Sequence, residues 1–304
     1  MHKPSFLLVV AGPTASGKTA VSVALAKHFQ TVVLSADSRQ FYREMNIGTA
    51  KPRPTEQQGI PHYFIDSLSI HDPYTVGDYE RDALELLEEL FQKHSLVILT
   101  GGSGLFIKAL CEGLDEFPEV PEGVRQALEQ QLEEKGIESL QAELLQTDPS
   151  YYQVVDRQNP VRLIRALSVI RASGQAFSSF RTQSRKSRPF QILYTSLEQD
   201  RDLLYERIDR RVDQMMKEGL AKEARELYPL RHLNALQTVG YQEFFDHFDG
   251  FYDLVGAVER IKRNSRRYAK RQLTWLRKQD QWTRFAKEDI AGMIQWVEEQ
   301  RKRR

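Results

Sequence analysis

The chain of 304 residues contains a single cysteine, Cys111, and no long hydrophobic run. One cysteine excludes an internal disulfide framework and a cysteine-rich zinc site. A helix that crosses a bilayer needs about 20 consecutive apolar residues, and the apolar runs of this sequence are far shorter. Residues 1–4 lead directly into the first of these runs, so we expect no signal peptide, no membrane partner and a cytoplasmic location.

The chain has little net charge, since its 43 Lys and Arg residues nearly balance its 42 Asp and Glu residues. The distribution is uneven, however, because the window from Arg260 to Lys278 contains nine basic residues and no acidic one. A local stripe of one sign matters more for binding a polyanion than the net charge does. The stripe therefore suits an RNA backbone, and we expect Arg266, Arg267 and Lys270 to make RNA binding depend on salt.

A glycine-containing turn after the apolar run Phe6–Ala11 carries the most specific pattern in the sequence. Its spacing, G-x-x-x-x-G-K-[ST] between a predicted strand and a predicted helix, indicates a phosphate-binding loop rather than a chance match. Backbone N–H groups and the helix N-terminus would surround phosphate, Lys18 would reach the terminal phosphates, and the Thr19 hydroxyl would bind Mg²⁺. The pattern does not name the nucleotide or the reaction. The loop residues are Gly12, Pro13, Thr14, Ala15, Ser16, Gly17, Lys18 and Thr19.

Buried apolar runs alternate with helical patterns over most of the chain, which predicts an α/β protein with a P-loop NTPase-like parallel sheet flanked by helices. The predicted strands are 6–11, 31–36, 62–66, 96–100 and 190–195. Helical patterns alone fill the segment from 118 to 188, at 122–135, 137–146 and 160–172. We therefore expect residues 1–117 and 189–304 to form the core with the C-terminal helices, and residues 118–188 to form an inserted helical domain.

Ligands of a parallel sheet bind beyond the carboxyl ends of its strands. Asp37 directly follows the second predicted strand, so it should lie on the same rim as the phosphate loop. Glycines 101, 102 and 104 follow the strand 96–100, where they would form either a tight turn or a close approach to a ligand. No acidic residue ends that strand, unlike in motor-type NTPases.

Seven further segments accompany the phosphate loop: 35–40, 45–52, 101–106, 159–167, 207–212, 239–243 and 268–275. In this order they resemble the tRNA dimethylallyltransferases, also called tRNA isopentenyltransferases. The resemblance covers most of the chain and is highly specific, which the phosphate loop alone would not be. It implies an enzyme that transfers a dimethylallyl group from dimethylallyl diphosphate to N6 of the adenine just 3′ of the anticodon in tRNA, releasing diphosphate.

The resemblance also implies that the loop holds the isoprenoid diphosphate rather than ATP. Lys18, Mg²⁺ bound by Thr19, and Arg211 would neutralise the departing diphosphate, and Asp37 would take a proton from the adenine amine. Arg207 would join Arg211 at the diphosphate. By helical spacing alone these two arginines share one face, and that spacing favours a solvated face paired to Glu206 or Asp209. The resemblance reverses this preference.

The implied tRNA contacts fall on the rim, on the inserted helices and on a later loop. Tyr241 could stack on a base or be a core aromatic, and both interpretations stay open here. The target adenine in a folded anticodon loop must be splayed out to be alkylated. The contacts are Asp37, Ser38, Arg39, Gln40, Ser103, Arg125, Val161, Arg162, Leu163, Ile164, Arg165, Gln237, Thr238, Val239, Gly240, Tyr241 and Gln242.

Three positions depart from the frequent family residues: Ser103 replaces threonine, Phe106 tyrosine and Tyr63 histidine. The C-terminal zinc finger of eukaryotic members has no counterpart here, so the chain resembles a bacterial-type member. We also expect the protein to be a monomer. Three alternative functions remain: a small-molecule P-loop kinase, an RNA-binding module without catalysis, and an isopentenyltransferase of free adenine nucleotides. The basic stripe argues against the first, the intact loop beside Asp37 against the second, and the RNA-suited segments after Val161 against the third.

Overall fold

The computed structural model describes residues 4–182 and 185–303. By their internal contacts the residues form two units. Unit 1 comprises Met1–Cys111 and Ser187–Arg304, and unit 2 comprises Glu112–Lys186. That residues 118–188 form an inserted helical domain stays a prediction.

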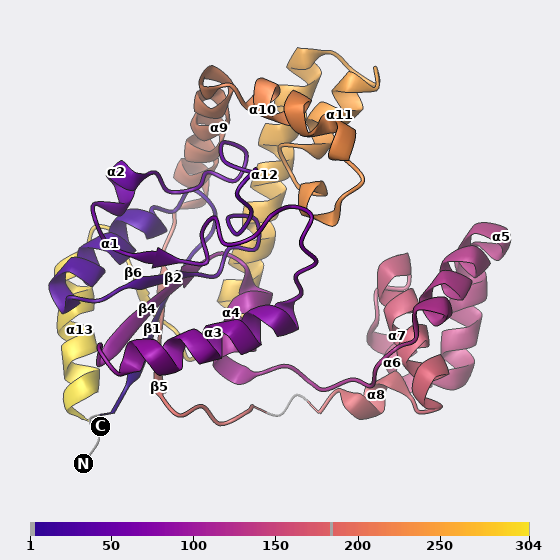
Figure 1. The fold of residues 1–304 in the computed structure, drawn as a ribbon, viewed down its shortest axis with the longest axis horizontal. Helices are drawn as coiled ribbons and strands as arrows, with labels where there is room; N and C mark the ends of the chain where they lie inside the picture. The colour runs from indigo at the N-terminus through magenta and orange to yellow at the C-terminus, as the bar shows by residue number, and fades with distance from the viewer. Residues whose placement is uncertain (1–3, 183–184, 304) are drawn as a thin grey trace. The chain divides into compact units, whose positions relative to one another are not determined.

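A parallel sheet of six strands forms the centre of unit 1 in the described part of the chain, with the order β3-β2-β4-β1-β5-β6 (Figure 1). This confirms the predicted fold class. The short sixth strand was not predicted. The strands are β1 Phe6–Ala11, β2 Val33–Ser35, β3 His62–Tyr63, β4 Leu96–Gly101, β5 Gln191–Leu197 and β6 Thr283–Phe285.

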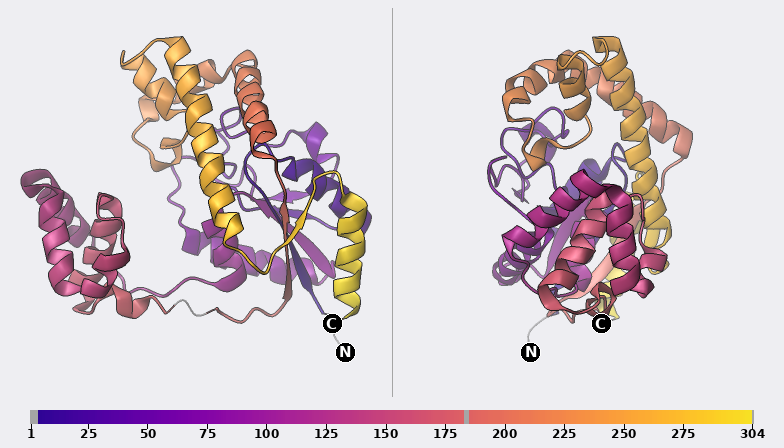
Figure 2. Two further views of the ribbon diagram at one scale, coloured as in Figure 1. Left: turned by 180° about the vertical axis from the view of Figure 1, so that it is seen from behind. Right: turned by 90° about the vertical axis from the view of Figure 1, so that its right-hand side faces the viewer.

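Helices cover both faces of the sheet, which is why its strands are continuous apolar runs. Leu7 and Val9 of β1 pack on the face covered by α3 (Val76–Phe91) and α4 (Gly104–Glu112). Leu8 and Val10 point to the other face, where α1 (Lys18–Phe29) and α13 (Ile290–Lys302) lie together (Figures 1 and 2). The C-terminal helix α13 is therefore part of the core.

A second core of unit 1 lies beyond the carboxyl edge of the sheet, around Tyr241 and Phe244. Its helices are α9 (Arg201–Glu218), α10 (Leu220–Leu227), α11 (Gln242–Phe248) and α12 (Leu254–Arg277), with α12 running beside α9 (Figure 2). Gly219 separates α9 from α10, because it adopts a left-handed conformation. Two single turns, Tyr228–Leu230 and Asn234–Leu236, and the short α2 (Pro54–Gln57) complete the unit.

The secondary-structure elements among the described residues of unit 2 are all helices. The unit contains α5 (Glu122–Thr147), α6 (Pro149–Val154), α7 (Pro160–Ser173) and α8 (Phe177–Phe180). The helical path of α5 breaks at Gly136, whose φ is 73°, which accounts for the two separate helices predicted there. Leu128, Leu140 and Leu163 are fully buried in the core that α5 and α7 share.

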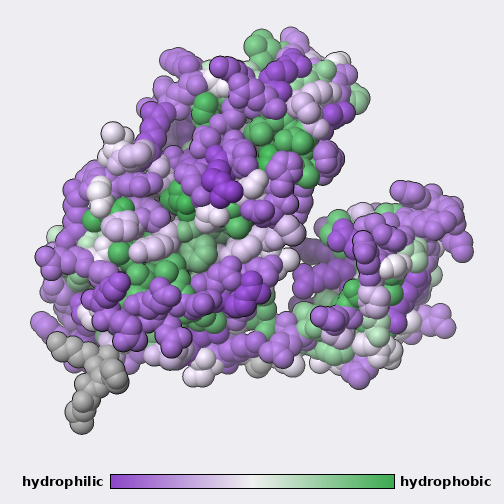
Figure 3. Space-filling model, viewed as in Figure 1, coloured by the Kyte–Doolittle hydropathy of each residue, from purple (hydrophilic) through white to green (hydrophobic). Residues whose placement is uncertain are grey.

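Hydrophilic residues cover most of the face shown in Figure 3. Among the helices of the described residues, none is both long enough and apolar enough to cross a membrane.

Candidate active site

The register of the sheet brings the predicted site to one edge. Ala11, the last residue of β1, pairs with Gly101 of β4 and Ser196 of β5, and Ser35 of β2 pairs with Thr100. The segments that leave these strands therefore begin side by side. They are the phosphate loop, the turn at Asp37, the glycine turn after β4 and the segment that leads into α9.

The phosphate loop turns into α1 at Gly17, whose φ of 90° is readily adopted only by glycine. Gly12 and Pro13, the first two residues of the loop, are buried. The Lys18 ammonium donates a hydrogen bond to the Pro13 carbonyl, at 2.7 Å. Burial lowers the pKa of Lys18 to about 8, an effect that Asp37 opposes and Arg211 reinforces. The ammonium thus lies in a desolvated position, where it interacts strongly with an anion.

Arg211 reaches the phosphate loop from α9. Its Nη1 donates to Thr14 Oγ1 at 3.1 Å, and its Nη2 donates to the Ala50 carbonyl at 3.3 Å. Burial lowers the pKa of this guanidinium as well, against the opposing charge of Asp37. Arg211 is therefore a buried cation fixed beside the loop, and its partner is not Glu206 or Asp209 in the described structure.

Arg207, one turn earlier on α9, donates to the side chain of Gln199, and Gln199 in turn donates to the Ser16 carbonyl at 3.4 Å. The Arg207 Nε and the Ser16 hydroxyl are both buried, and neither has a hydrogen-bond partner among the described residues. A diphosphate contact of Arg207 stays a prediction. What the structure shows is that Arg207 supports the loop through Gln199.

Asp37 is half-buried on the rim, and its charge acts on the pKa of Lys18, Arg211 and Tyr268. Its Oδ1 accepts a hydrogen bond from the Arg39 amide at 3.2 Å, whereas its Oδ2 accepts none from the described residues. Burial and the Asp37 charge raise the pKa of Tyr268, which hydrogen-bonds Ser103. Asp37 thus caps the local turn with one oxygen and presents the other to its surroundings.

A cavity of about 780 Å³ in unit 1 joins these groups. The loop residues Thr14–Thr19, the rim residues Asp37–Gln40, and Arg207 and Arg211 of α9 line it. Gln237–Gly240 and Gln242 line it too, as do Tyr268 and Arg271 of α12. Most of the residues predicted to bind diphosphate, and the predicted tRNA contacts on the rim and on the 237–242 segment except Tyr241, therefore surround one space.

Arg39 ties two of the predicted tRNA segments together. Its Nη1 donates to the carbonyls of Asn234 and Ala235, both at 3.0 Å, and its Nη2 donates to that of Gln237 at 3.4 Å. Gln242 donates to the Gln237 side chain at 2.7 Å. The guanidinium of Arg39 is thus committed to shaping the 234–237 segment.

The stacking role considered for Tyr241 is wrong, because its side chain is fully buried. Its ring packs against Gly48, and its hydroxyl donates to Glu223 at 2.7 Å. Burial and the Glu223 charge hold the pKa of Tyr241 far above its usual range. Tyr241 is a core residue, and its neighbours in sequence face the cavity in its place.

Glu223 of α10 is a residue that the sequence reasoning missed. Its carboxylate accepts hydrogen bonds from the amides of Asn46, Ile47 and Gly48, at 2.8 to 3.1 Å, besides the bond from Tyr241. It thereby fixes the 45–52 loop, whose residues Gly48–Ala50 line the cavity. No local pattern marks such a contact, since it joins segments about 175 residues apart.

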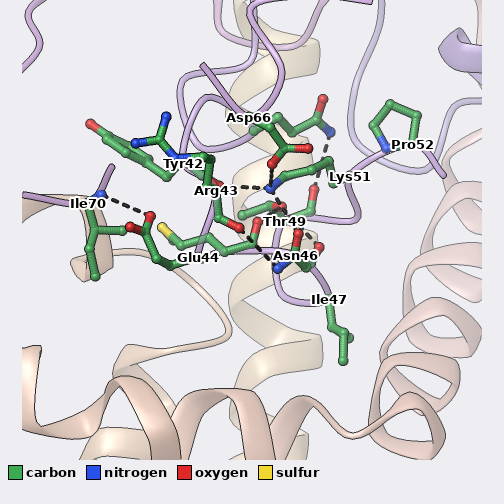
Figure 4. A network of polar contacts seen from close by, with 12 residues as sticks. Tyr42, Arg43, Glu44, Asn46, Ile47, Thr49, Lys51, Pro52, Asp66 and Ile70 are labelled. Carbon is green, nitrogen blue, oxygen red and sulfur yellow. Dashed lines mark hydrogen bonds and ion pairs between the residues drawn. The ribbon is translucent and has the colours of Figure 1, made fainter. Parts of the chain in front are cut away.

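Lys51 also stabilises this loop through polar contacts (Figure 4). Its ammonium donates to the Tyr42 carbonyl at 2.8 Å and to Asn46 Oδ1 at 3.0 Å, and it forms an ion pair with Asp66. The side chain of Lys51 is only 6% exposed, so the ammonium is held in place. The 45–52 segment therefore has a defined conformation at the cavity edge.

Replacing Glu223 with alanine is expected to lower the free energy of unfolding by about 3 kcal/mol, because four donors lose a charged acceptor. The measurement is urea denaturation followed by circular dichroism. Glu226→Ala on the same helix is the control, since Glu226 is exposed and pairs only loosely with Lys222; we expect a change within about 0.5 kcal/mol. Equal stabilities of the two variants would contradict the assignment.

Some of the predicted tRNA contacts on unit 2 are exposed to solvent, and others are buried. Arg125, Val161, Arg162 and Arg165 are exposed. Leu163 and Ile164 are buried in the core of unit 2, so the prediction that they contact tRNA is corrected for their side chains: they face the helices of their own unit. The α7 face that contains Val161 and Arg165 keeps the predicted role as a prediction.

The basic stripe on α12 is exposed only in part. Arg266 forms an ion pair with Asp209 of α9, with an N–O distance of 2.5 Å, and Lys262 forms one with Asp213 at 2.7 Å. The RNA role expected for Arg266 is therefore corrected, because its charge holds α9 and α12 together. Trp275 packs against Gly104 and Trp282. The exposed cations of the stripe are Arg260, Arg263, Arg267, Lys270, Arg271, Arg277 and Lys278.

The parallel sheet, with the G-x-x-x-x-G-K-T loop between β1 and α1, defines a P-loop protein. A sequence profile of the IPP transferase family matches residues 40–279. A tRNA dimethylallyltransferase of Christiangramia forsetii is 50% identical over 97% of this chain and 98% of its own length. One of Cytophaga hutchinsonii is 48% identical over 96% of both chains. The chain belongs to this family, the tRNA dimethylallyltransferases.

A solved structure supports the same grouping. The tRNA isopentenylpyrophosphate transferase of Bacillus halodurans is 36% identical and superimposes with a TM-score of 0.74, covering 98% of this chain and 97% of that one. The fold and the sequence therefore agree on the family.

Proposed function

We propose that this enzyme transfers the dimethylallyl group of dimethylallyl diphosphate to N6 of the adenine just 3′ of the anticodon in tRNA, releasing diphosphate. The observation that carries the proposal is the 780 Å³ cavity, which joins the phosphate loop, the buried Arg211 and Asp37.

The phosphate loop and Arg211 would bind the diphosphate and stabilise it as it departs. Breaking the allylic C–O bond leaves extra negative charge on the leaving diphosphate, and cations already held in a desolvated site stabilise that charge without reorganisation. Lys18 and Arg211 are such cations, since burial lowers the pKa of both. Thr14, bonded to Arg211, keeps the guanidinium against the loop.

Mg²⁺ fits this site as a substrate-bound ion. The described residues contain no cluster of three or more His, Cys, Asp or Glu side chains that could hold a metal. A single protein ligand, the Thr19 hydroxyl, together with diphosphate oxygens and water, is a ligand set that Mg²⁺ accepts. When bound, the ion would add positive charge at the leaving diphosphate.

Asp37 would accept the proton that the adenine amine loses. The exocyclic amine is a weak nucleophile because its lone pair is delocalised into the ring, and alkylation makes the nitrogen cationic. A carboxylate within hydrogen-bond reach removes the proton as the N–C bond forms. Oδ2 of Asp37 is available for this, while Oδ1 keeps the side chain oriented through the Arg39 amide.

The test is incubation of the protein with labelled dimethylallyl diphosphate and either tRNA or AMP, and separately with labelled ATP. We expect label to enter tRNA in a Mg²⁺-dependent reaction, at N6 of the adenine 3′ of the anticodon. Label in AMP alone would show an isopentenyltransferase of free nucleotides. Phosphate transfer from ATP to an acceptor, without alkylation of tRNA, would show a kinase.

Exposed cations of α12 are expected to make tRNA binding depend on salt. The triple variant Arg263→Ala, Arg267→Ala and Lys270→Ala should weaken tRNA binding and reduce the slope of log K against log [salt] by about 0.7 to 0.9 for each phosphate that the protein no longer neutralises. The measurement is fluorescence anisotropy of a labelled anticodon stem-loop between 50 and 200 mM salt, a range of about fourfold.

The control for that variant removes the same charge elsewhere, by replacing the exposed Lys93, Lys108 and Lys302 with alanine. The control should keep the slope of the unmodified protein. If both triple variants shift the slope equally, α12 is not a preferred RNA surface.

A further inference from the structure

Gln272 of α12 is a polar residue on the buried side of a basic helix. It follows Ala269 and precedes Leu276 at intervals of three and four residues, and all three are buried, with Gln272 only 8% exposed. A polar side chain on such an apolar stripe needs hydrogen-bond partners. Both the oxygen and the nitrogen of the Gln272 side-chain amide have a hydrogen-bond partner.

Gln272 bridges the two turns at the carboxyl edge of the sheet. Its Oε1 accepts a hydrogen bond from the Thr14 amide of the phosphate loop at 2.9 Å. Its Nε2 donates to the Gly102 carbonyl in the glycine turn after β4, also at 2.9 Å. One amide therefore joins α12, the phosphate loop and the glycine turn, which lie 258 and 170 residues from it in the sequence.

Glycine at position 102 makes this bridge possible. A Cβ there would overlap Nε2 of Gln272 and would lie 3.2 Å from the Gly12 carbonyl. The glycine turn, which the sequence left open between a tight turn and a ligand contact, thus serves to admit the Gln272 amide next to the phosphate loop.

Thr14 is consequently held by two helices. Its amide is bound by Gln272 of α12, and its hydroxyl by Arg211 of α9. A phosphate loop binds anions through several N–H groups in a fixed arrangement, so the residue that anchors its first half affects all of them. The Thr14 amide itself is already occupied by Gln272.

We propose that Gln272 is a positioning residue of this enzyme, which holds the phosphate loop from α12 in the conformation that binds diphosphate. The inference rests on the proposed function only for the identity of the anion. Because Tyr268 and Arg271, on the turn of α12 before Gln272, line the same cavity, the bridge also connects the surface offered to RNA with the diphosphate site.

The experiment measures binding of inorganic diphosphate with Mg²⁺ by calorimetry, using the full chain. Gln272→Leu removes both hydrogen bonds at similar size, and we expect the dissociation constant to rise about 5-fold or more, as the loss of a hydrogen bond typically gives. Gln272→Glu keeps an acceptor for the Thr14 amide but adds a negative charge beside the anion, so its affinity should be lower still. Gln295→Leu is the matched control, since Gln295 is exposed on α13 and bonded to Glu299; it should bind like the unmodified protein.

A second pair of variants tests the bridge without changing Gln272. Gly102→Ala should displace the amide and weaken diphosphate binding as Gln272→Leu does. Gly123→Ala should have no effect, because nothing lies within 4 Å of a Cβ at that position. Thermal unfolding of each variant shows whether it is folded at the temperature of the titration.

A purely structural role would lower thermal stability and leave the diphosphate affinity of the folded protein unchanged. Bound anticodon stem-loop provides a further readout: it should tighten diphosphate binding in the unmodified protein about 5-fold or more, and much less in Gln272→Leu. Unchanged affinity in folded Gln272→Leu and Gly102→Ala would overturn the inference while leaving the proposed function intact. An unmodified protein that binds no diphosphate would overturn both.

Discussion

Asp37→Asn is expected to lower the turnover rate by about 10²-fold or more, as the loss of a general base typically does. The substitution keeps the shape of the side chain and an oxygen that can accept the Arg39 amide, as Oδ1 does now. It removes only the ability to take up a proton. We therefore expect diphosphate and tRNA affinities to stay nearly intact.

Single-turnover rates, with separately measured affinities, check this expectation. Asp202→Asn is the control, because Asp202 is exposed in the first turn of α9. Turnover of Asp37→Asn near that of the unmodified enzyme would place the base elsewhere. Loss of Mg²⁺-dependent diphosphate binding alone would make Asp37 a residue of the metal site.

Lys18→Met is expected to lower turnover by about 10² to 10³-fold, the range found when a preorganised group that stabilises transition-state charge is removed. Methionine is similar in length but carries no charge, so the loop keeps its packing and loses one buried cation. Diphosphate affinity should also fall, whereas tRNA affinity should not.

Lys27→Met, on the same helix, is the control for Lys18→Met, since Lys27 is exposed and its ammonium contacts Gln58. Its turnover should match that of the unmodified enzyme. A Lys18→Met enzyme with full activity would show that the loop does not act on the diphosphate during transfer.

The depressed pKa of Lys18 makes diphosphate binding depend on pH. With a pKa of about 8, the ammonium loses its proton as pH rises through that value, so affinity for inorganic diphosphate should fall above pH 8. Below pH 8 the affinity should be nearly constant with respect to this group. The same titration of Lys18→Met should lack the step.

The same pKa shift makes folding stability change with pH in the direction opposite to diphosphate affinity. The folded pKa of Lys18 lies below its ordinary value of 10.5, so between about pH 8 and 10.5 the unfolded chain binds more protons than the folded one. Folding stability contributed by this group therefore rises with pH across that window. Binding and stability moving in opposite directions would identify Lys18 as the group responsible.

The parallel sheet, the phosphate loop and the rim position of Asp37 could all be predicted from the amino-acid sequence. Two-sided burial requires continuous apolar strands, and the loop requires fixed spacing of glycine, lysine and threonine, so both leave local patterns. The rim position of Asp37 follows from a general property of parallel sheets. The break at Gly136 and the end of α9 at Gly219 were likewise predictable, because they depend on the backbone freedom of single glycines.

The polar residues that support the site, and the predicted contacts that are buried, became known from the three-dimensional packing. Glu223, Gln199 and Gln272 act through hydrogen bonds to segments far away in the sequence. Tyr241 and Arg266 suit RNA by residue type, yet one packs in a core and the other pairs with Asp209. The physical reason is the same in each case: the partner of a side chain depends on how distant elements pack, and periodicity within one helix or strand does not contain that information.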